Sequence, residues 1–212
     1  SNVKIVCTTD DPADDLKYHA LLAKEKDFDC KVLPGFRPDK ALGIELPGFA
    51  EYIKKLGESA GVDIKSYKDV ISALLARIDF FNAAGCRVSD HAFSYMPYVQ
   101  DSEEQIEASF ERAMSGEKIS QRDADAYKTA VMQVLGKKYH TLGWAMEIHI
   151  GAMRNNNSKM FAALGPDTGF DSVGDDKTAY MLSRFLDSLC SRDKLPKTVL
   201  FNLNSKDNIV LA

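Results

Sequence analysis

The sequence has little of what membrane, secreted and nucleic-acid-binding proteins need. No apolar run approaches the roughly 20 residues that span a bilayer, and the N-terminus lacks the basic-then-apolar pattern of a signal peptide. Basic side chains, 27 against 31 acidic ones, show no excess that would favour nucleic acid or an anionic membrane surface. These absences predict a cytoplasmic protein without nucleic-acid or membrane partners, and they leave a small anionic molecule as a possible ligand.

Closely spaced cysteines, which would indicate a metal or redox site, are also absent. Cys7, Cys30, Cys86 and Cys190 are widely spaced, form no CxxC pair, and each lies in or beside an apolar run. We therefore expect four reduced, mostly buried thiols.

Repeats, low-complexity tracts and flexible linkers are missing as well, so we expect residues 1–212 to form a single domain. The chain has no initiator Met. One strand-like run begins at Val3, and another ends at Leu203, close to the last residue. Both features predict that the chain is a fragment of something longer.

The sequence does contain an alternation of β-rich and helical segments. Five β-rich runs cover residues 3–9, 30–36, 86–90, 145–150 and 198–203. Helical periodicity covers residues 14–23, 49–56, 67–84, 102–115, 120–136 and 178–189, and the helices at 102–136 form an insertion. Such alternation, with nearly continuous apolar strands, is typical of a parallel sheet covered by helices.

Each β-rich run ends in polar residues. They occupy positions 8–12, 37–40, 89–91, 149–157 and 202–204. Because the carboxyl ends of parallel strands meet at one edge, where α/β proteins gather functional groups, we expect these residues to lie together. Polar loops also start at strand ends in proteins without a site there, so placement alone does not establish catalysis.

His149 lies between Ile148 and Ile150, so its side chain is expected on the opposite face of the strand from theirs. At a barrel strand's end that face is the interior mouth, where a neutral imidazole can ligate a divalent metal or move a proton. The alternative is a core histidine bonded to a backbone carbonyl.

Arg154 is followed by three consecutive asparagines, residues 155–157. Three amides beside a guanidinium offer many hydrogen-bond donors to a polyhydroxylated anion. Three asparagines in a surface turn are the competing explanation.

Arg37 precedes Pro38, whose ring restrains the arginine to an extended backbone. Rigid placement suits a bidentate grip on a carboxylate. A structural salt bridge from Arg37 to Asp39 or Asp10 is the alternative.

Asp90 and His91 are adjacent at a strand end, so they point to opposite faces and only one is expected to face the barrel mouth. Residues 165–171 are rich in glycine and aspartate but lack the spacing of a phosphate-binding loop. We interpret them as a turn.

Taken together, several strings resemble the uronate isomerase family, also called glucuronate isomerases, within the amidohydrolase superfamily. The resemblance covers essentially the whole chain. The strings are TTDDP (8–12), VLP (32–34), RPDKA (37–41), GCRVSDH (85–91), HIGAMRNNN (149–157), LGPDTGFD (164–171), LPKT (195–198) and LN (203–204).

The resemblance implies a distorted (β/α)8 barrel and an aldose–ketose isomerase. Its substrates would be hexuronates, interconverted as D-glucuronate with D-fructuronate and D-galacturonate with D-tagaturonate. It also implies that Arg37, Asp90 and Arg154 are catalytic, that Arg37, Arg154 and Asn155 bind substrate, and that His149 ligates a divalent metal, zinc.

The chain departs from the family pattern in two places. It has neither the His-x-His pair of the first barrel strand nor the metal-binding Asp of the last. We therefore expect a partial (β/α)8 TIM-type barrel of about five parallel strands, inactive by itself and homo-oligomeric. Two alternatives stay open: a metal-dependent hydrolase of the same superfamily, and a catalytically inert, self-associating fragment.

Overall fold

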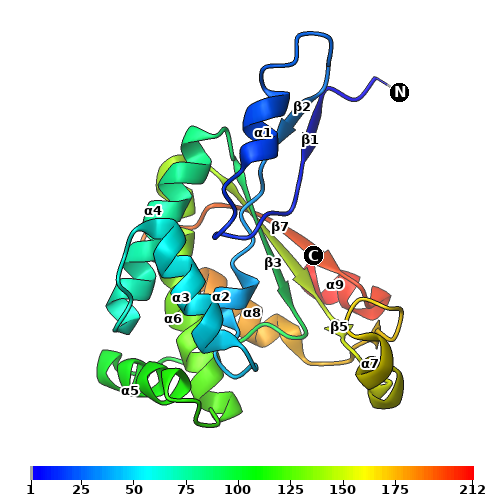
Figure 1. The fold of residues 1–212 in the computed structure, drawn as a ribbon. Coiled ribbons are helices and arrows are strands. Elements are labelled where there is room, and N and C mark those ends of the chain that lie inside the picture. Colours follow the sequence, from blue (N-terminus) through cyan, green and yellow to red (C-terminus); the bar gives the residue numbers. More distant parts are fainter. Residues whose placement is uncertain (1) are drawn as a thin grey trace.

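The computed structural model describes residues 2–212 and places five parallel strands in chain order (Figure 1). The strands are β1 (Ile5–Cys7), β2 (Lys31–Leu33), β3 (Val88–Phe93), β4 (Ala145–Ile150) and β7 (Lys197–Asn202). β1 pairs with β2, and β3, β4 and β7 form a second sheet. Phe36 joins the two groups through parallel bridges to Asp10 and Ser89. This arrangement is a partial (β/α)8 barrel, as the sequence predicts.

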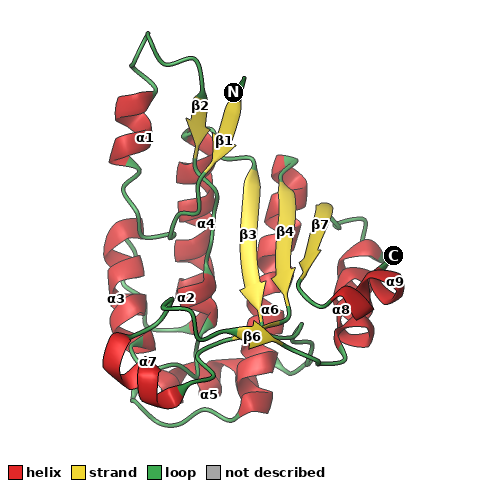
Figure 2. Cartoon of the chain, turned by 90° about the vertical axis from the view of Figure 1, so that its right-hand side faces the viewer, coloured by secondary structure: helices red, strands yellow, loops and turns green. Residues whose placement is uncertain are grey.

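Helices alternate with these strands. They are α1 (Lys17–Leu22), α2 (Asp39–Leu42), α3 (Phe49–Ala60), α4 (Tyr67–Ala83), α5 (Glu103–Met114), α6 (Gln121–Leu142), α7 (Ser158–Leu164), α8 (Thr178–Cys190) and α9 (Asn208–Leu211). Figure 2 shows α6 behind the strands β3 and β4, and α4 to the side of β3 on which β1 and β2 lie. A short antiparallel pair, β5 (Ala152–Met153) and β6 (Ser172–Val173), lies at the end to which the parallel strands point.

The start signals of the two inserted helices are confirmed. Ser102 and Ser120 accept hydrogen bonds from backbone N–H groups at the first turns of α5 and α6. The predicted end of the second helix at Gly136 is wrong, because α6 continues to Leu142. Gly136 is an interior position at which a Cβ would lie 2.8 Å from Leu189 of α8, so glycine permits close helix packing there.

The first two strands are shorter than predicted, and the third continues to Phe93. The two segments that follow β1 and β2 still form backbone hydrogen bonds with each other, from Thr8 N to Leu33 O and from Asp10 N to Gly35 O. The approach is so close that a Cβ on Gly35 would lie 2.4 Å from the carbonyl oxygen of Thr8. The ladder is therefore irregular at this point, and only glycine fits position 35.

The two faces of the β3–β4–β7 sheet differ. Met146, Ile148 and Ile150 are buried against the helices, in one hydrophobic cluster that also includes Phe36 and Trp144. Residues of the other face pair in register across the sheet: Asp90 with Glu147 and Val199, and Ala92 with His149 and Phe201. The helix-covered face thus supplies the core, and the uncovered face carries the polar residues.

Arg77 of α4 holds the loop that follows β1. Its buried guanidinium donates hydrogen bonds to the carbonyl oxygens of Pro12 (2.7 Å), Asp14 (2.7 Å) and Ser59 (2.9 Å), and it lies 4.0 Å from the ring centre of Phe80. These bonds tie the loop and the end of α3 to one helix. They fix the position of residues 8–12 relative to the rest of the barrel.

The prediction of mostly buried thiols is wrong. Cys86 is buried, but Cys7 and Cys190 are exposed and Cys30 is partly exposed; all four are free. Cys7 lies on β1, whose three residues are all exposed. Among residues 2–212, no helix has both the length and the apolar character needed to cross a membrane.

We predict that the 212-residue chain self-associates in solution. Within residues 2–212, β1 and β7 each pair along one edge only, and Val6, Val199 and Phe201 are each more than two-fifths exposed. Burying about 800 Å² of apolar surface contributes on the order of 20 kcal/mol before the entropic costs of association. Sedimentation velocity measures the outcome.

The variant Val199→Asp/Phe201→Asp should weaken this association, because each Asp would have to be buried without a partner. Tyr180→Ser, at an exposed position of α8, is the matched control. A strictly monomeric wild-type mass at micromolar concentration would contradict the prediction.

Candidate active site

Asp90 of β3 is the centre of a polar cluster built from four segments. Its Oδ2 lies 3.3 Å from Nη1 of Arg37 and accepts a hydrogen bond from Thr9 Oγ1 at 3.3 Å. Its Oδ1 lies 2.8 Å from Nδ1 of His149. The carboxylate is almost buried, so these contacts form at low local dielectric and are stronger than at the surface.

Arg37 reaches Asp90 because Phe36, the preceding residue, is completely buried. Phe36 N donates to Val88 O, and Asp90 N donates to Phe36 O. These two bonds place Arg37 next to Asp90 of β3. Arg37 Nε also donates to Asp39 Oδ2 at 2.7 Å. The salt bridge to Asp39 is thus present, whereas Asp10 meets Arg37 only through a backbone bond.

The charges around Arg37 are closely coupled. Burial lowers the pKa of Arg37, but the hydrogen bond to Asp39 and the charges of Asp39 and Asp90 outweigh it, and on balance its pKa is raised. Burial raises the pKa of Asp39, although Arg37 opposes that effect. Arg37 therefore stays fully charged and joins two carboxylates.

His149 is partly exposed, with its ring stacked on Phe201 at 4.6 Å between centres and 9° between planes. The contact between its Nδ1 and Asp90 Oδ1 is close but is not aligned as a hydrogen bond, and both buried atoms otherwise lack a partner. This is the barrel-mouth position expected from the alternation, and it is not that of a core histidine bonded to a carbonyl.

His91 lies on the opposite face from Asp90, as predicted. It is completely buried, with Nε2 3.2 Å from Ser89 Oγ and its ring near Tyr139. Burial, reinforced by the charges of Arg37 and His149, lowers the pKa of His91 to about 3. His91 is therefore a neutral packing residue.

Arg154 and Asn155 lie in the turn after β5. Arg154 Nη1 is 2.6 Å from Asp171 Oδ2 and 3.4 Å from Asp167 Oδ1. The N–H of Asn155 donates to Asp171 Oδ1 at 3.0 Å. Residues 165–171 form the turn that the sequence predicts, and it folds back onto Arg154.

Two of the three asparagines use their side chains to bond to the nearby backbone. Asn156 Nδ2 donates to Met153 O at 2.8 Å, and Asn157 Oδ1 accepts from Met160 N at 3.1 Å, which caps α7. Of the three asparagines, only Asn155 has a side chain that makes no hydrogen bond to another group of residues 2–212. The surface-turn explanation therefore holds for Asn156 and Asn157, because short amides readily bond to nearby backbone.

All five residues expected from the sequence line one cavity of about 1230 Å³ at the carboxyl ends of the strands: Arg37, Asp90, His149, Arg154 and Asn155. Thr9 and Asp39, which belong to the predicted polar strand ends, also line it, as do Glu147, Lys128 and Phe201, which were not singled out from the sequence. Glu147 had a signal, because it lies two residues before His149 and shares its face. Burial and the charge of Asp90 raise the pKa of Glu147.

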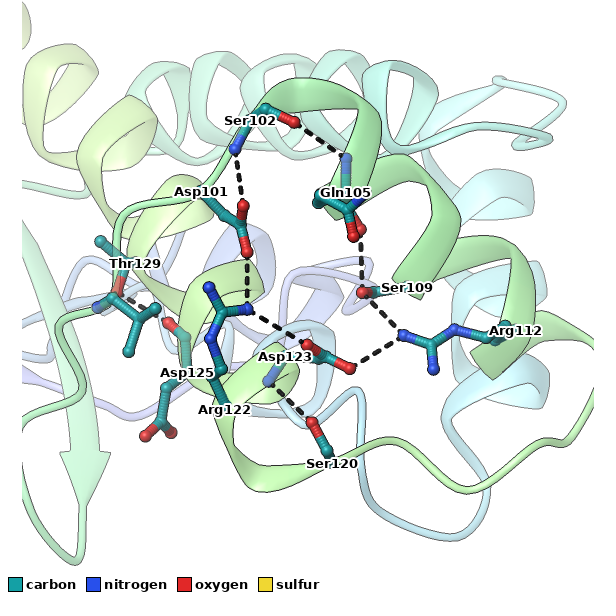
Figure 3. Close-up of polar contacts among 11 residues, drawn as sticks. Asp101, Ser102, Gln105, Ser109, Arg112, Ser120, Arg122, Asp123, Asp125 and Thr129 are labelled. Carbon is teal, nitrogen blue, oxygen red and sulfur yellow. Dashed lines mark hydrogen bonds and ion pairs between the residues drawn. The ribbon is translucent and has the colours of Figure 1, made fainter.

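The inserted helices supply the wall of this cavity that carries Asp125 and Lys128. Figure 3 shows how their ends are joined: Arg112 to Asp123 at 2.9 Å, and Arg122 to Asp101 at 2.8 Å. These pairs connect α5 and the loop before it to the first turn of α6. The insertion is thereby held as one unit beside the barrel.

The residues present do not complete a metal site. Among residues 2–212, no three His, Cys, Asp or Glu side chains lie close enough to hold a metal ion. One imidazole in contact with one carboxylate falls short of the four ligands of a typical zinc site. The facing atoms Nδ1 of His149 and Oδ1 of Asp90 lack a hydrogen-bond partner within residues 2–212.

Parallel strands in chain order, with polar side chains gathered at their carboxyl ends, define a protein of the TIM-barrel class. The family model for glucuronate isomerase matches residues 1–212, so the chain belongs to the glucuronate isomerase family. The resemblance found in the sequence is thereby confirmed.

Curated relatives named uronate isomerase include one from Caldanaerobacter subterraneus subsp. tengcongensis, 52% identical over all of this chain and 46% of the relative. Another, from Clostridium acetobutylicum, is 51% identical over all of this chain and 45% of the relative. The chain thus spans less than half the length of these relatives.

Two solved structures are similar to the chain. Uronate isomerase from Thermotoga maritima has a TM-score of 0.90 and 35% identity, over 97% of this chain and 45% of that one. Glucuronate isomerase from Caulobacter crescentus has a TM-score of 0.87 and 25% identity, over 97% and 42%.

We predict that His91 makes folding stability depend on pH. Its pKa of about 3 in the folded chain lies below the ordinary value of 6.5, so the unfolded chain binds one more proton between these pH values. The contribution of His91 to the free energy of unfolding is therefore complete above pH 6.5. It is lost as the pH falls from 6.5 toward 3, by up to about 1.4 kcal/mol per pH unit.

Urea denaturation at several pH values tests this prediction. His91→Asn should reduce the slope of unfolding free energy against pH, whatever its effect on absolute stability. The same change at exposed His140 is the control. Equal slopes in His91→Asn and wild type would contradict the assignment.

Proposed function

We propose that this chain carries part of the active site of a uronate isomerase, which interconverts D-glucuronate with D-fructuronate and D-galacturonate with D-tagaturonate. The observation that carries the proposal is the convergence of Arg37, Asp90, His149, Arg154 and Asn155 on one cavity. The names of the relatives support the same reaction. They favour it over the hydrolase alternative.

The reaction moves a proton between C2 and C1 of an open-chain sugar acid through an enediol. It requires a group that handles the proton, donors for the developing charge on oxygen, and a cation for the C6 carboxylate. Asp90 beside Nδ1 favours the imidazole tautomer that carries its proton there. Nε2 of His149 is then left as an electron-pair donor.

Arg37 and Arg154 are the two guanidinium groups of the cavity. A guanidinium has five N–H donors, so Arg37 retains donors for a substrate carboxylate beyond its contacts with Asp39 and Asp90. Arg154 is half exposed and pairs with Asp171. We assign both to carboxylate and hydroxyl recognition, together with the unbonded Asn155 side chain.

We propose that His149 supplies one ligand to a divalent metal, zinc, whose other ligands lie outside these residues. Such an ion would polarise a sugar oxygen as a Lewis acid. Phe201 restrains the imidazole plane by stacking, and Asp90 Oδ1 lies 2.8 Å from Nδ1. These two contacts orient the ring for ligation through Nε2.

We also propose that residues 1–212 act as one domain of a cytoplasmic homo-oligomer. The continuous hydrophobic cluster that joins strands and helices supports a single domain. The one-sided pairing of β1 and β7 supports association. By itself, this chain is expected to be inactive, because its residues supply only part of the donor set.

The main test is Arg37→Lys in the full-length gene product that carries these residues. We expect kcat/KM for glucuronate to fall by about one to three orders of magnitude, because the ammonium group of lysine cannot replace the two parallel N–H donors of a planar guanidinium. Circular dichroism should show little loss of fold. Arg184→Lys, at an exposed position of α8, is the control. Wild-type kinetics in Arg37→Lys would leave Arg37 as only a structural ion-pair partner.

A second prediction concerns metal content. His149→Ala in the full-length gene product should lower metal occupancy, since loss of one of about four ligands opens the site. Elemental analysis after gel filtration measures the occupancy, with exposed His140→Ala as the control. Unchanged zinc content in His149→Ala would remove His149 from the proposed ligands.

A further inference from the structure

Two of the proposed substrate-binding residues lie outside the parallel sheet. Arg154 and Asn155 follow the two-residue strand β5, and the Arg154 side chain is 50% exposed. No regular backbone ladder of the main sheet reaches them. Their positions relative to the cavity therefore depend on contacts within their own turn.

Asp171 makes the contacts that connect both residues to the facing turn. One carboxylate oxygen, Oδ2, lies 2.6 Å from Arg154 Nη1, and the other, Oδ1, accepts the N–H of Asn155 at 3.0 Å. The two oxygens of one side chain are thus divided between a guanidinium and the next residue's backbone. Such a fork fixes the direction of the arginine relative to the asparagine.

The backbone around Asp171 reinforces this arrangement. Asn156 N donates to Phe170 O at 2.7 Å, and β5 pairs with β6 at Met153 and Ser172. Asn155 has a φ of 56°, in the left-handed region that asparagine adopts more readily than most other non-glycine residues. Asp171 accepts the N–H of this residue, so it bonds the backbone at the point where the chain turns.

The Asp171–Arg154 pair is too exposed to contribute much to folding stability, since exposed ion pairs contribute little. The hydrogen bond from Asn155, followed by the bond and charge of Arg154, lowers the pKa of Asp171. The carboxylate therefore stays ionised at neutral pH. Its effect is on the geometry of the turn.

We propose that Asp171 is a positioning residue that presents Arg154 and Asn155 to the hexuronate. The proposal rests on the function proposed above. Asp171 acts through the two residues that it holds, so its loss should weaken substrate binding more than turnover. A merely structural residue would instead change folding stability.

The test compares Asp171→Asn, Asp171→Glu and Asp167→Asn in the full-length gene product. Asp171→Asn keeps the size of the side chain but removes its charge, and we expect KM for glucuronate to rise about 10- to 100-fold with a smaller change in kcat. Asp171→Glu should recover part of this loss. Asp167→Asn is the matched control, because the more exposed Asp167 contacts Arg154 at 3.4 Å and should stay within about twofold of wild type.

A second measurement makes the result independent of activity. Hydrogen exchange of residues 153–157 in the 212-residue chain should be faster in Asp171→Asn than in wild type or Asp167→Asn, with the melting temperature unchanged. Absence of hexuronate turnover in the wild type would overturn the proposed function, and the exchange data would still decide the role of Asp171. The positioning role would be overturned if Asp171→Asn left both the hydrogen exchange and KM unchanged. It would also be overturned if Asp171→Asn lowered the melting temperature and Asp167→Asn raised KM by the same factor.

Discussion

The polar site depends on the burial of one residue, Phe36. Within residues 2–212, its bridges to Asp10 and Ser89 are the strand pairing that joins β1 and β2 to the three-stranded sheet. Its ring lies among Phe81, Tyr139 and Trp144, at the centre of the core. Because its backbone bonds to both Val88 and Asp90, it sets Arg37 beside Asp90. A hydrophobic contact thus determines where the charges meet.

Arg77 gives the same site a second support from a different direction. Three carbonyl oxygens accept from its buried guanidinium, which carries no paired carboxylate in the described part of the chain. Two of those carbonyls belong to the loop that follows Thr9, whose hydroxyl donates to Asp90. Backbone carbonyl dipoles stabilise the charge of Arg77, so the loop is held without a further carboxylate. The cluster around Asp90 is consequently assembled from four segments with few flexible contacts.

Periodicity in the sequence predicted the strands, the helical insertion and the faces of His149 and His91, because these follow from alternation along one element. Pairings between elements were harder to predict. The stack of His149 on Phe201 depends on the register of β4 with β7, and the contact of Arg37 with Asp90 depends on Phe36. The local bonds of Asn156 and Asn157 could not be predicted, because a side-chain amide can bond either to a ligand or to the nearby backbone. Gly136 was misinterpreted because glycine both ends helices and lets them pack closely.

The cavity wall formed by this chain carries more negative than positive charge. Its carboxylates are Asp39, Glu45, Asp90, Asp125 and Glu147, and its cationic groups are Arg37, Lys128 and Arg154. A small anion approaching this wall meets net repulsion at long range and attraction at the cationic groups. Since salt screens the long-range part more than contacts inside the cavity, we expect added salt to favour the encounter of an anion with this wall. Encounter and binding would then depend on charges of opposite sign.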